Sequence, residues 1–218
     1  MYKVVIYNND TNRLETYWRR ISDQMPYTAN RYLTVKEFKG KSNSTILWTT
    51  KATMQNFNTL RKRWAKPIYV GYAFRRPWEG GHGKQSQHYA GTAMDIAQNL
   101  KPSVRKDLHQ LAVKLGIYTY VEPYVMTPTW VHIDKRYGSP ACSAGYPVLK
   151  YGSKGVYVFI LQDALDFLGY DVGSLDGIFG NKTYNAVLSF QRNNGISTTG
   201  NVACQTWTRL TNLVVGKG

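Results

Sequence analysis

Five stretches of the chain carry apolar residues three or four positions apart, the spacing of one face of an α-helix. These stretches are residues 49–64, 102–115, 157–168, 181–193 and 206–213. Proline and glycine mark their ends: Pro67 follows the first stretch, whereas Pro102 and Gly116 bracket the second. The pattern therefore predicts five helices, three of them short and placed in the last third of the chain.

Shorter runs rich in β-branched and aromatic residues predict strands. These runs are residues 2–7, 68–74, 93–96, 117–122 and 129–134. None falls in the last third, where glycine-rich connections separate three short helices. We therefore expect an α+β domain with a small antiparallel sheet, followed by an all-α three-helix bundle.

A cluster of turn-forming residues separates the two predicted parts. Residues 137–149 contain Gly138, Pro140, Gly145 and Pro147, and the density of charge falls beyond them. The sequence thus predicts a first domain at residues 1–145 and a second at residues 146–218.

Composition narrows the class of protein. Apolar residues make up 43% of the chain, enough for a core, yet no run approaches the roughly 20 apolar residues that span a membrane. The N-terminus lacks the pattern of a secretory signal. The net charge of +15 lies mostly in residues 1–145 and favours a polyanionic partner, but no nucleic-acid-binding motif accompanies it.

The two cysteines, Cys142 and Cys204, are far apart in the sequence and lack a CxxC context. This spacing fits neither a zinc ribbon nor a disulfide-dense scaffold. Two independent thiols are expected.

The residues with most chemical information lie in two segments, Ser86–Asp95 and Trp130–Asp134. A catalytic zinc site needs three protein ligands and one open position for water. His88, Asp95 and His132 offer two imidazoles and a carboxylate. The spacing of the first two is too long for one helical face and suits a loop that returns on a strand.

The pattern SxHxxGxAxD, followed by a strand with HxD, resembles the D-Ala-D-Ala carboxypeptidase family of zinc peptidases, in the clan shared with lysostaphin and hedgehog proteins. Tyr72–Arg75 and Gly80–Gly81 also look like the arginine strand and glycine loop of that family. The resemblance covers roughly residues 30–137. It implies a zinc cofactor with His88, Asp95 and His132 as ligands.

A zinc peptidase also needs a carboxylate that moves a proton from water to the leaving amine. In relatives this acid lies a few positions before the last histidine, but Thr129 stands three positions before His132. Glu122 is the nearest acid upstream and is the preferred candidate. Asp134 is the alternative, either as the base or as a hydrogen-bond acceptor that orients a ligand histidine.

The arginines near the predicted site differ in their expected roles. Arg75 is expected to hold a developing oxyanion or a substrate carboxylate, because its guanidinium offers paired donors. Arg76 is expected to point to the opposite face, into solvent. Ser86 either supports the site by hydrogen bonding or caps a turn, and His82, after two glycines, is expected to be an ordinary loop residue.

Residues 148–213 resemble a type-1 peptidoglycan-binding domain. The landmarks, in order, are Leu161-Gln162, Asp176-Gly177-Ile178-Phe179-Gly180, Thr183, Phe190-Gln191 and Thr206-Trp207. Most of them have the character of turn or core residues, so the resemblance implies wall binding without identifying the groove.

Together these resemblances imply zinc-dependent hydrolysis of peptide bonds in peptidoglycan stem peptides or cross-links, by a carboxypeptidase or a lysin- or autolysin-like endopeptidase. Peptidoglycan, and with it anionic wall polymers, is the expected partner of a monomeric protein that acts at the bacterial cell wall. Two alternatives stay open: an inactive wall-binding protein, or an N-acetylmuramoyl-L-alanine amidase. DNA binding driven by charge is a weaker third, and predicts a steep salt dependence.

Overall fold

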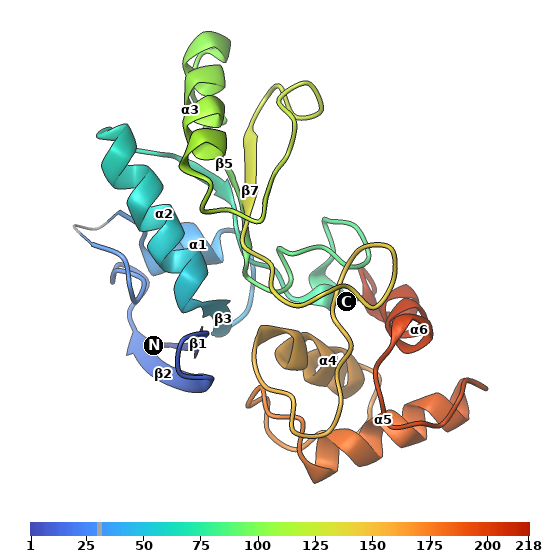
Figure 1. The fold of residues 1–218 in the computed structure, drawn as a ribbon. Coiled ribbons are helices and arrows are strands. Elements are labelled where there is room, and N and C mark those ends of the chain that lie inside the picture. Colours follow the sequence, from blue (N-terminus) through green and yellow to red (C-terminus); the bar gives the residue numbers. More distant parts are fainter. Residues whose placement is uncertain (30–31) are drawn as a thin grey trace.

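The computed structural model describes residues 1–29 and 32–218, so the start of the resembling segment, at residues 30–31, lies outside it. Figure 1 shows two sheets with their helices, followed by a compact helical part. The strands are β1 (Tyr2–Asn8), β2 (Arg13–Arg19), β3 (Ile46–Thr50), β4 (Val70–Tyr72), β5 (Ala93–Ile96), β6 (Tyr120–Val121) and β7 (Val131–Asp134). The helices are α1 (Val35–Lys39), α2 (Lys51–Trp64), the 3-10 helix η1 (Pro77–Glu79), α3 (Pro102–Leu115), α4 (Val156–Phe167), α5 (Asn181–Asn193) and α6 (Cys204–Val214).

The first sheet has three strands in the order β2-β1-β3. β1 pairs antiparallel with β2 and parallel with β3. Of these strands only β1 was predicted. β2 was missed because it is rich in polar residues and forms through its pairing with β1. The family resemblance did not account for residues 1–30. The structure shows that the hairpin β1-β2 in this segment pairs with β3.

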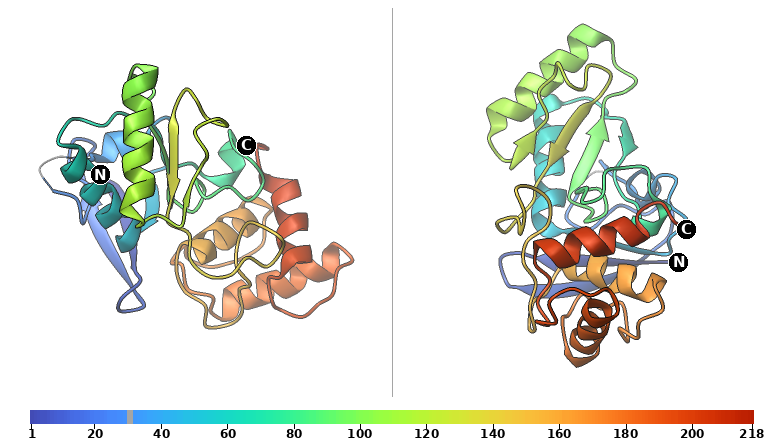
Figure 2. Two further views of the ribbon diagram at one scale, coloured as in Figure 1. Left: turned by 45° about the horizontal axis from the view of Figure 1, so that its top comes forward. Right: turned by 90° about the vertical axis from the view of Figure 1, so that its right-hand side faces the viewer.

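The second sheet is antiparallel, in the order β4-β5-β7-β6, and carries the candidate site. β5 matches the run that predicted it, whereas β4, β6 and β7 are shorter than theirs, since each pairs over only a few residues. α3 packs against β6, β7 and α2, as Figure 2 shows. The α+β architecture with a small antiparallel sheet is confirmed.

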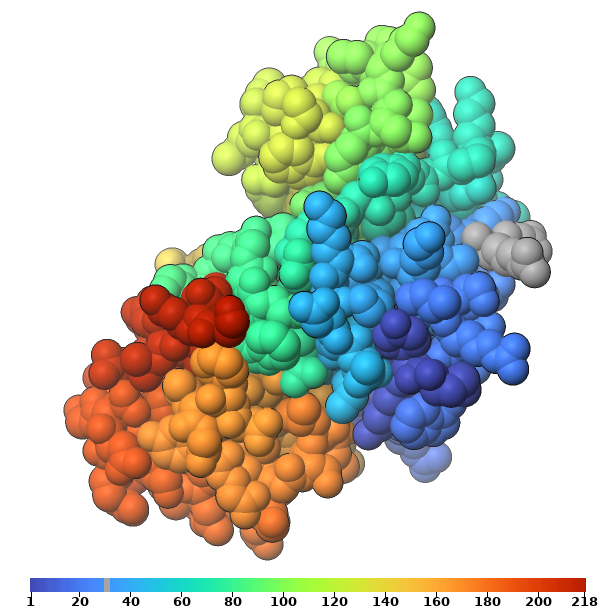
Figure 3. All heavy atoms as spheres, turned by 180° about the vertical axis from the view of Figure 1, so that it is seen from behind, coloured from blue at the N-terminus to red at the C-terminus, as the bar shows by residue number. Residues whose placement is uncertain are grey.

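The helical part consists of α4, α5 and α6, with α4 in contact with both others. α4 is buried along most of its length because it also packs against β3 and η1. The ring of Phe159 on α4 stacks on Trp48 of β3 at 5.2 Å, and the buried apolar residues of both parts form one cluster. Figure 3 shows the red C-terminal residues lying against the green segment that includes η1. The backbone N–H of Gly218 donates to the carbonyl of Trp78 there.

The expectation of two independent thiols is wrong, because Cys142 and Cys204 form a disulfide with their Cα atoms 5.0 Å apart. The bond joins the connecting segment to the start of α6. Proximity arises from packing across that segment, where the indole of Trp207 donates to the carbonyl of Pro147. Sequence spacing carries no record of such packing.

The expectation that Arg76 faces solvent is also wrong. Its side chain is 11% exposed and forms a paired salt bridge with Asp163 of α4, with Nε to Oδ2 at 2.8 Å. Arg76 lies beyond the end of β4, so the strand alternation used for the prediction does not extend to it. The domain boundary near residue 146 stays a prediction. Among the described residues, no helix is long and apolar enough to cross a membrane.

Candidate metal centre

One row of side chains crosses the second sheet. Tyr72 pairs with Asp95, and Asp95 pairs with His132. The backbone N–H of Glu122 donates to the carbonyl of His132 and continues the register of β6 and β7. Residues directly opposite one another on antiparallel strands share a face. The sheet therefore places Tyr72, Asp95, His132 and Glu122 on one side.

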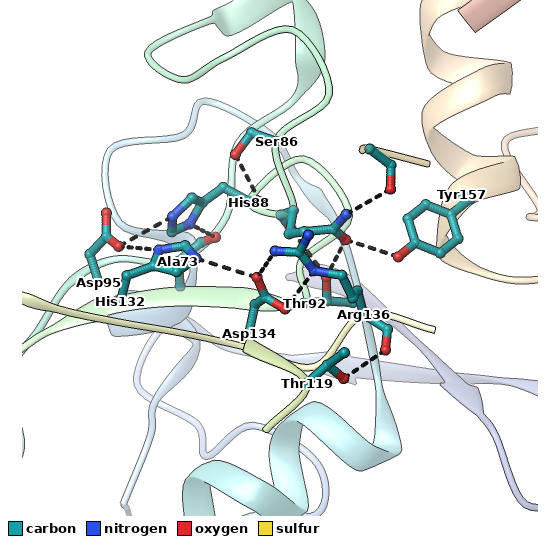
Figure 4. A network of polar contacts seen from close by, with 12 residues as sticks. Ala73, Ser86, His88, Thr92, Asp95, Thr119, His132, Asp134, Arg136 and Tyr157 are labelled. Atoms are coloured by element: carbon teal, nitrogen blue, oxygen red, sulfur yellow. Dashed lines mark hydrogen bonds and ion pairs between the residues drawn. The ribbon is translucent and has the colours of Figure 1, made fainter. Parts of the chain in front are cut away.

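His88 reaches this face from the turn that precedes β5. Its ring Nδ1 lies 3.0 Å from the carbonyl of Ala73, which fixes the proton on Nδ1 and leaves the lone pair on Nε2. Nε2 lies 3.4 Å from Oδ1 of Asp95 and is buried without a hydrogen-bond partner. Figure 4 shows His88 and His132 directed toward Asp95.

His132 is held between two carboxylates. Its Nδ1 lies 2.7 Å from Oδ1 of Asp95, and its Nε2 lies 3.5 Å from Oδ2 of Asp134. Burial alone lowers the pKa of His132, but the two carboxylates outweigh burial and raise it to about 9. Likewise, burial tends to raise the pKa of Asp95, but the neighbouring imidazoles of His132 and His88 lower it well below its usual range.

These donors fit a zinc ion. A tetrahedral centre with bonds of about 2.0–2.1 Å separates neighbouring ligand atoms by about 3.3 Å, close to the 3.4 Å between His88 Nε2 and Asp95 Oδ1. The buried, unpartnered Nε2 of His88 needs an electrophile, and two imidazoles with a carboxylate are ligands that zinc favours. A proton lies between His132 Nδ1 and Asp95 Oδ1. Metal binding releases such a proton, because the metal needs the deprotonated forms of its ligands.

The two acids proposed from the sequence have different surroundings. Asp134 is 1% exposed and accepts from Nε of Arg136 at 2.9 Å as well as facing His132. Glu122 is half-buried, and its carboxylate has no hydrogen-bond or ion-pair partner among residues 1–29 and 32–218. Because Asp134 contacts both Arg136 and His132, it is placed to orient the ring of His132. The carboxylate oxygens of Glu122 remain free to accept a proton.

The arginine and serine of the predicted site also lie near it. The guanidinium carbon of Arg75 lies 5.5 Å from the centre of the Tyr72 ring, and its Nε is buried without a hydrogen-bond partner. The hydroxyl of Ser86 accepts a hydrogen bond from the backbone N–H of His88 at 3.3 Å. Ser86 thus supports the turn that carries His88.

The sequence treated His82 as an ordinary loop residue, but the structure brings it to the site. His82, His88 and Asp95 each offer a ligand atom, and these atoms lie within 4.8 Å of one another. Burial, followed by the neighbouring His88, lowers the pKa of His82 to about 3. The position after Gly80-Gly81 was the available signal, but spacing alone does not show which way the loop folds.

The helical part contributes to the turn around His88. The hydroxyl of Tyr157 on α4 donates to Oε1 of Gln87 at 2.9 Å, and the hydroxyl of Tyr146 donates to the carbonyl of Ser86 at 2.8 Å. Tyr157 and Gln87 are both buried. In Figure 4, Tyr157 projects from its helix toward this network. The turn that presents His88 is therefore held from both parts of the chain.

Comparison with known proteins assigns a class to each part. Residues 31–134 match the model of the family Peptidase M15, and residues 154–210 match the model of the putative peptidoglycan binding domain. The two matches, taken in this order along the chain, confirm the fusion expected from the sequence.

Two solved structures share part of the chain. A peptidoglycan-binding protein from Clostridioides difficile, solved with glutamine hydroxamate, is 44% identical over 31% of this chain and 42% of that chain, with a TM-score of 0.30. The N-terminal domain of SleB is 33% identical over 31% of this chain and 92% of that chain, also with a TM-score of 0.30. This chain thus spans less than half of the first of these proteins.

Proposed function

We propose that this protein is a zinc-dependent peptidase that hydrolyses peptide bonds in the stem peptides or cross-links of bacterial peptidoglycan. The observation that carries the proposal is the convergence of His88 Nε2, His132 Nδ1 and Asp95 Oδ1 on one face of the sheet. The match of residues 31–134 to Peptidase M15 supports the reaction class, and the match of residues 154–210 supports the substrate.

His88, Asp95 and His132 would hold the metal. A zinc ion bound by them supplies a Lewis acid for the scissile carbonyl and makes a water nucleophile available at neutral pH. The carboxylate of Asp134 faces Nε2 of His132 at 3.5 Å and so keeps Nδ1 directed at the site.

Two further residues complete the proposed chemistry. The carboxylate of Glu122 takes a proton from the attacking water and delivers it to the leaving amine. The guanidinium of Arg75 donates to the developing oxyanion or to a substrate carboxylate. The buried and unpartnered Nε of Arg75 is consistent with a group that meets its acceptor only when substrate is bound.

The proposed setting follows from the domains. The peptidoglycan-binding domain brings the chain to the wall of a bacterial cell, where the net charge of +15 favours anionic wall polymers. We propose that the protein acts there as a monomer, with its domain boundary near residue 146.

The test uses purified full-length protein on isolated peptidoglycan. Wild-type protein is expected to bind about one zinc ion and to release peptides that mass spectrometry of the muropeptides identifies. His88→Ala and Asp95→Ala are each expected to abolish release while sedimentation with cell wall is retained. Near-full activity of either variant would show that the ligand assignment is wrong.

A second function, wall binding without catalysis, has one specific observation in its favour. Thr129 stands where relatives of the resembling family place the catalytic acid. Zinc binding by the wild type without cleavage of several wall types would support this function. A product cut between N-acetylmuramic acid and L-alanine would instead identify an amidase.

A further inference from the structure

His82 lies in a short loop of the chain between η1 and the turn that carries His88. Glycines flank it on both sides, as Gly80-Gly81 before it and Gly83 after it. Gly81 adopts a φ of +93°, and a Cβ there would meet the hydroxyl of Tyr72 at 2.8 Å. This backbone conformation lets the loop pass close to β4 and turn the imidazole inward.

The imidazole of His82 packs against two neighbouring rings, and its backbone is hydrogen-bonded to Tyr89. It stacks on the ring of His88 at a centroid distance of 4.0 Å and meets the edge of Tyr72 at 4.1 Å. The buried hydroxyl of Tyr89 accepts from the backbone N–H of His82 at 3.2 Å and donates to its carbonyl at 3.0 Å. The loop is therefore attached to the residue that follows His88 in the sequence.

The donor atom of His82 has no partner. Its Nε2 is buried without a hydrogen bond, as is Nε2 of His88. Two adjacent buried imidazole nitrogens without partners are costly unless something binds them. The ligand atoms of His82, His88 and Asp95 lie within 4.8 Å of one another, so all three could hold one ion once the stacked ring of His82 turns its Nε2 toward it.

We propose that His82 is a fourth protein ligand of the metal held by His88, Asp95 and His132. The proposal rests on the metal centre of the proposed function. Four protein ligands close a zinc site, whereas catalysis requires an open position. His82 therefore holds the ion in a closed resting site, and its release from the metal opens the position that substrate and water need.

Different anchoring explains why His82 is the ligand that leaves. Asp95 and His132 stand on paired strands, and His88 is tied to the carbonyl of Ala73. His82 stands on a loop in which a glycine precedes and follows it, and a Cβ added at Gly83 would meet nothing within 4 Å. The loop has room to move without breaking a strand.

The experiment compares metal binding by wild type, His82→Phe, His82→Ala and Lys84→Ala. His82→Phe retains an aromatic ring for stacking and removes only the donor nitrogens, and Lys84 is an exposed residue of the same loop. Zinc affinity is measured by competition with a chelator, and the visible spectrum of the Co²⁺-loaded protein reports the number of ligands.

Both His82 variants are expected to bind zinc at least about tenfold more weakly than wild type, the scale seen when groups around a metal site are removed. Their Co²⁺ spectra are expected to shift toward a site with more water, whereas Lys84→Ala matches wild type. Turnover at saturating zinc is expected to increase in both, because the position that His82 occupies in the closed site is then open.

The two proposals fail in different ways. If wild type binds zinc, His88→Ala does not, and His82→Phe matches wild type in affinity and Co²⁺ spectrum, His82 is not a ligand and the proposed function stands. If wild type binds no zinc at all, the metal centre and the role of His82 both fall. Circular dichroism of the metal-free variants checks that each is folded.

Discussion

At the scale of single residues, surroundings separate two acids that the sequence left as alternatives. Asp134 is buried and engaged by Arg136 and His132, so its charge is already compensated. Glu122 lies opposite His132, directly after the end of β6, with an unengaged carboxylate. A proton acceptor needs free lone pairs, whereas a group that orients a ligand needs fixed ones. These surroundings favour Glu122 as base and Asp134 as the positioning residue.

Substitution of each acid by its amide separates the two roles. Glu122→Gln is expected to leave zinc affinity unchanged and to slow turnover about a hundredfold or more. Asp134→Asn is expected to weaken zinc binding about 10- to 100-fold, because the partner of His132 is altered. Zinc titration and kcat on muropeptides measure the two effects. If Glu122→Gln weakened zinc binding and Asp134→Asn slowed turnover with zinc still bound, Asp134 would be the base and Glu122 the positioning residue.

At the scale of elements, the turn at residues 85–92 is held against β3. The indole of Trp48 donates to the carbonyl of Tyr89 at 2.8 Å, and the hydroxyl of Thr49 donates to the carbonyl of Gly91 at 2.6 Å. Gly91 has a φ of +65°, and a Cβ there would collide with the carbonyl oxygen of Trp48. Gly91, the glycine of the SxHxxGxAxD pattern, thus allows the turn to approach the backbone of β3 closely, and this approach positions His88.

Alanine at Gly91 tests this approach, with Gly116→Ala as the matched control. Both glycines have nearly the same φ, +65° and +62°, but a Cβ at Gly116 meets nothing within 4 Å. Gly116→Ala is expected to lower the free energy of unfolding by about 1–2 kcal/mol, the cost of left-handed backbone. Gly91→Ala is expected to lower the free energy of unfolding by more than this and to weaken zinc binding as well. Equal losses in urea unfolding would contradict the packing argument.

At the scale of the whole molecule, the helical part is more than a tether for the part that carries the candidate metal centre. Asp163 of α4 pairs with Arg76, Phe159 stacks on Trp48, and Tyr157 binds Gln87 beside His88. The disulfide adds a covalent connection between the linking segment and α6. Tethering raises the local concentration of substrate, but these contacts also make the helical part a support for the site.

The buried pair between the two parts gives a direct test. Asp163→Asn leaves the buried guanidinium of Arg76 without a counter-charge, so the free energy of unfolding is expected to fall by about 3–5 kcal/mol. Asp171→Asn, which removes an exposed partner of Lys182, is expected to leave the free energy of unfolding close to that of wild type, because water screens an exposed ion pair. Urea unfolding measures both. Comparable effects of the two variants would show that the contact between the parts contributes little.

The sequence by itself determined the features that depend on nearby residues. The bounds of α3 match the run from Pro102 to Leu115, because a helix satisfies its hydrogen bonds within the segment and its ends carry local signals. α4 and α5 were predicted for the same reason, to within a residue at each end. The candidate ligands were named from the sequence because two short segments carry the chemistry of a metal site.

Only the tertiary structure decided what depends on contacts between distant segments. The polar strand β2 exists through its partner β1, and Cys142 meets Cys204 because the helical part folds back on the connecting segment. Arg76 is buried by a helix 87 positions away, and the direction of His82 follows from its contacts with Tyr72 and Tyr89. Packing between surfaces sets these features, and a linear pattern of polar and apolar residues does not specify which surfaces meet.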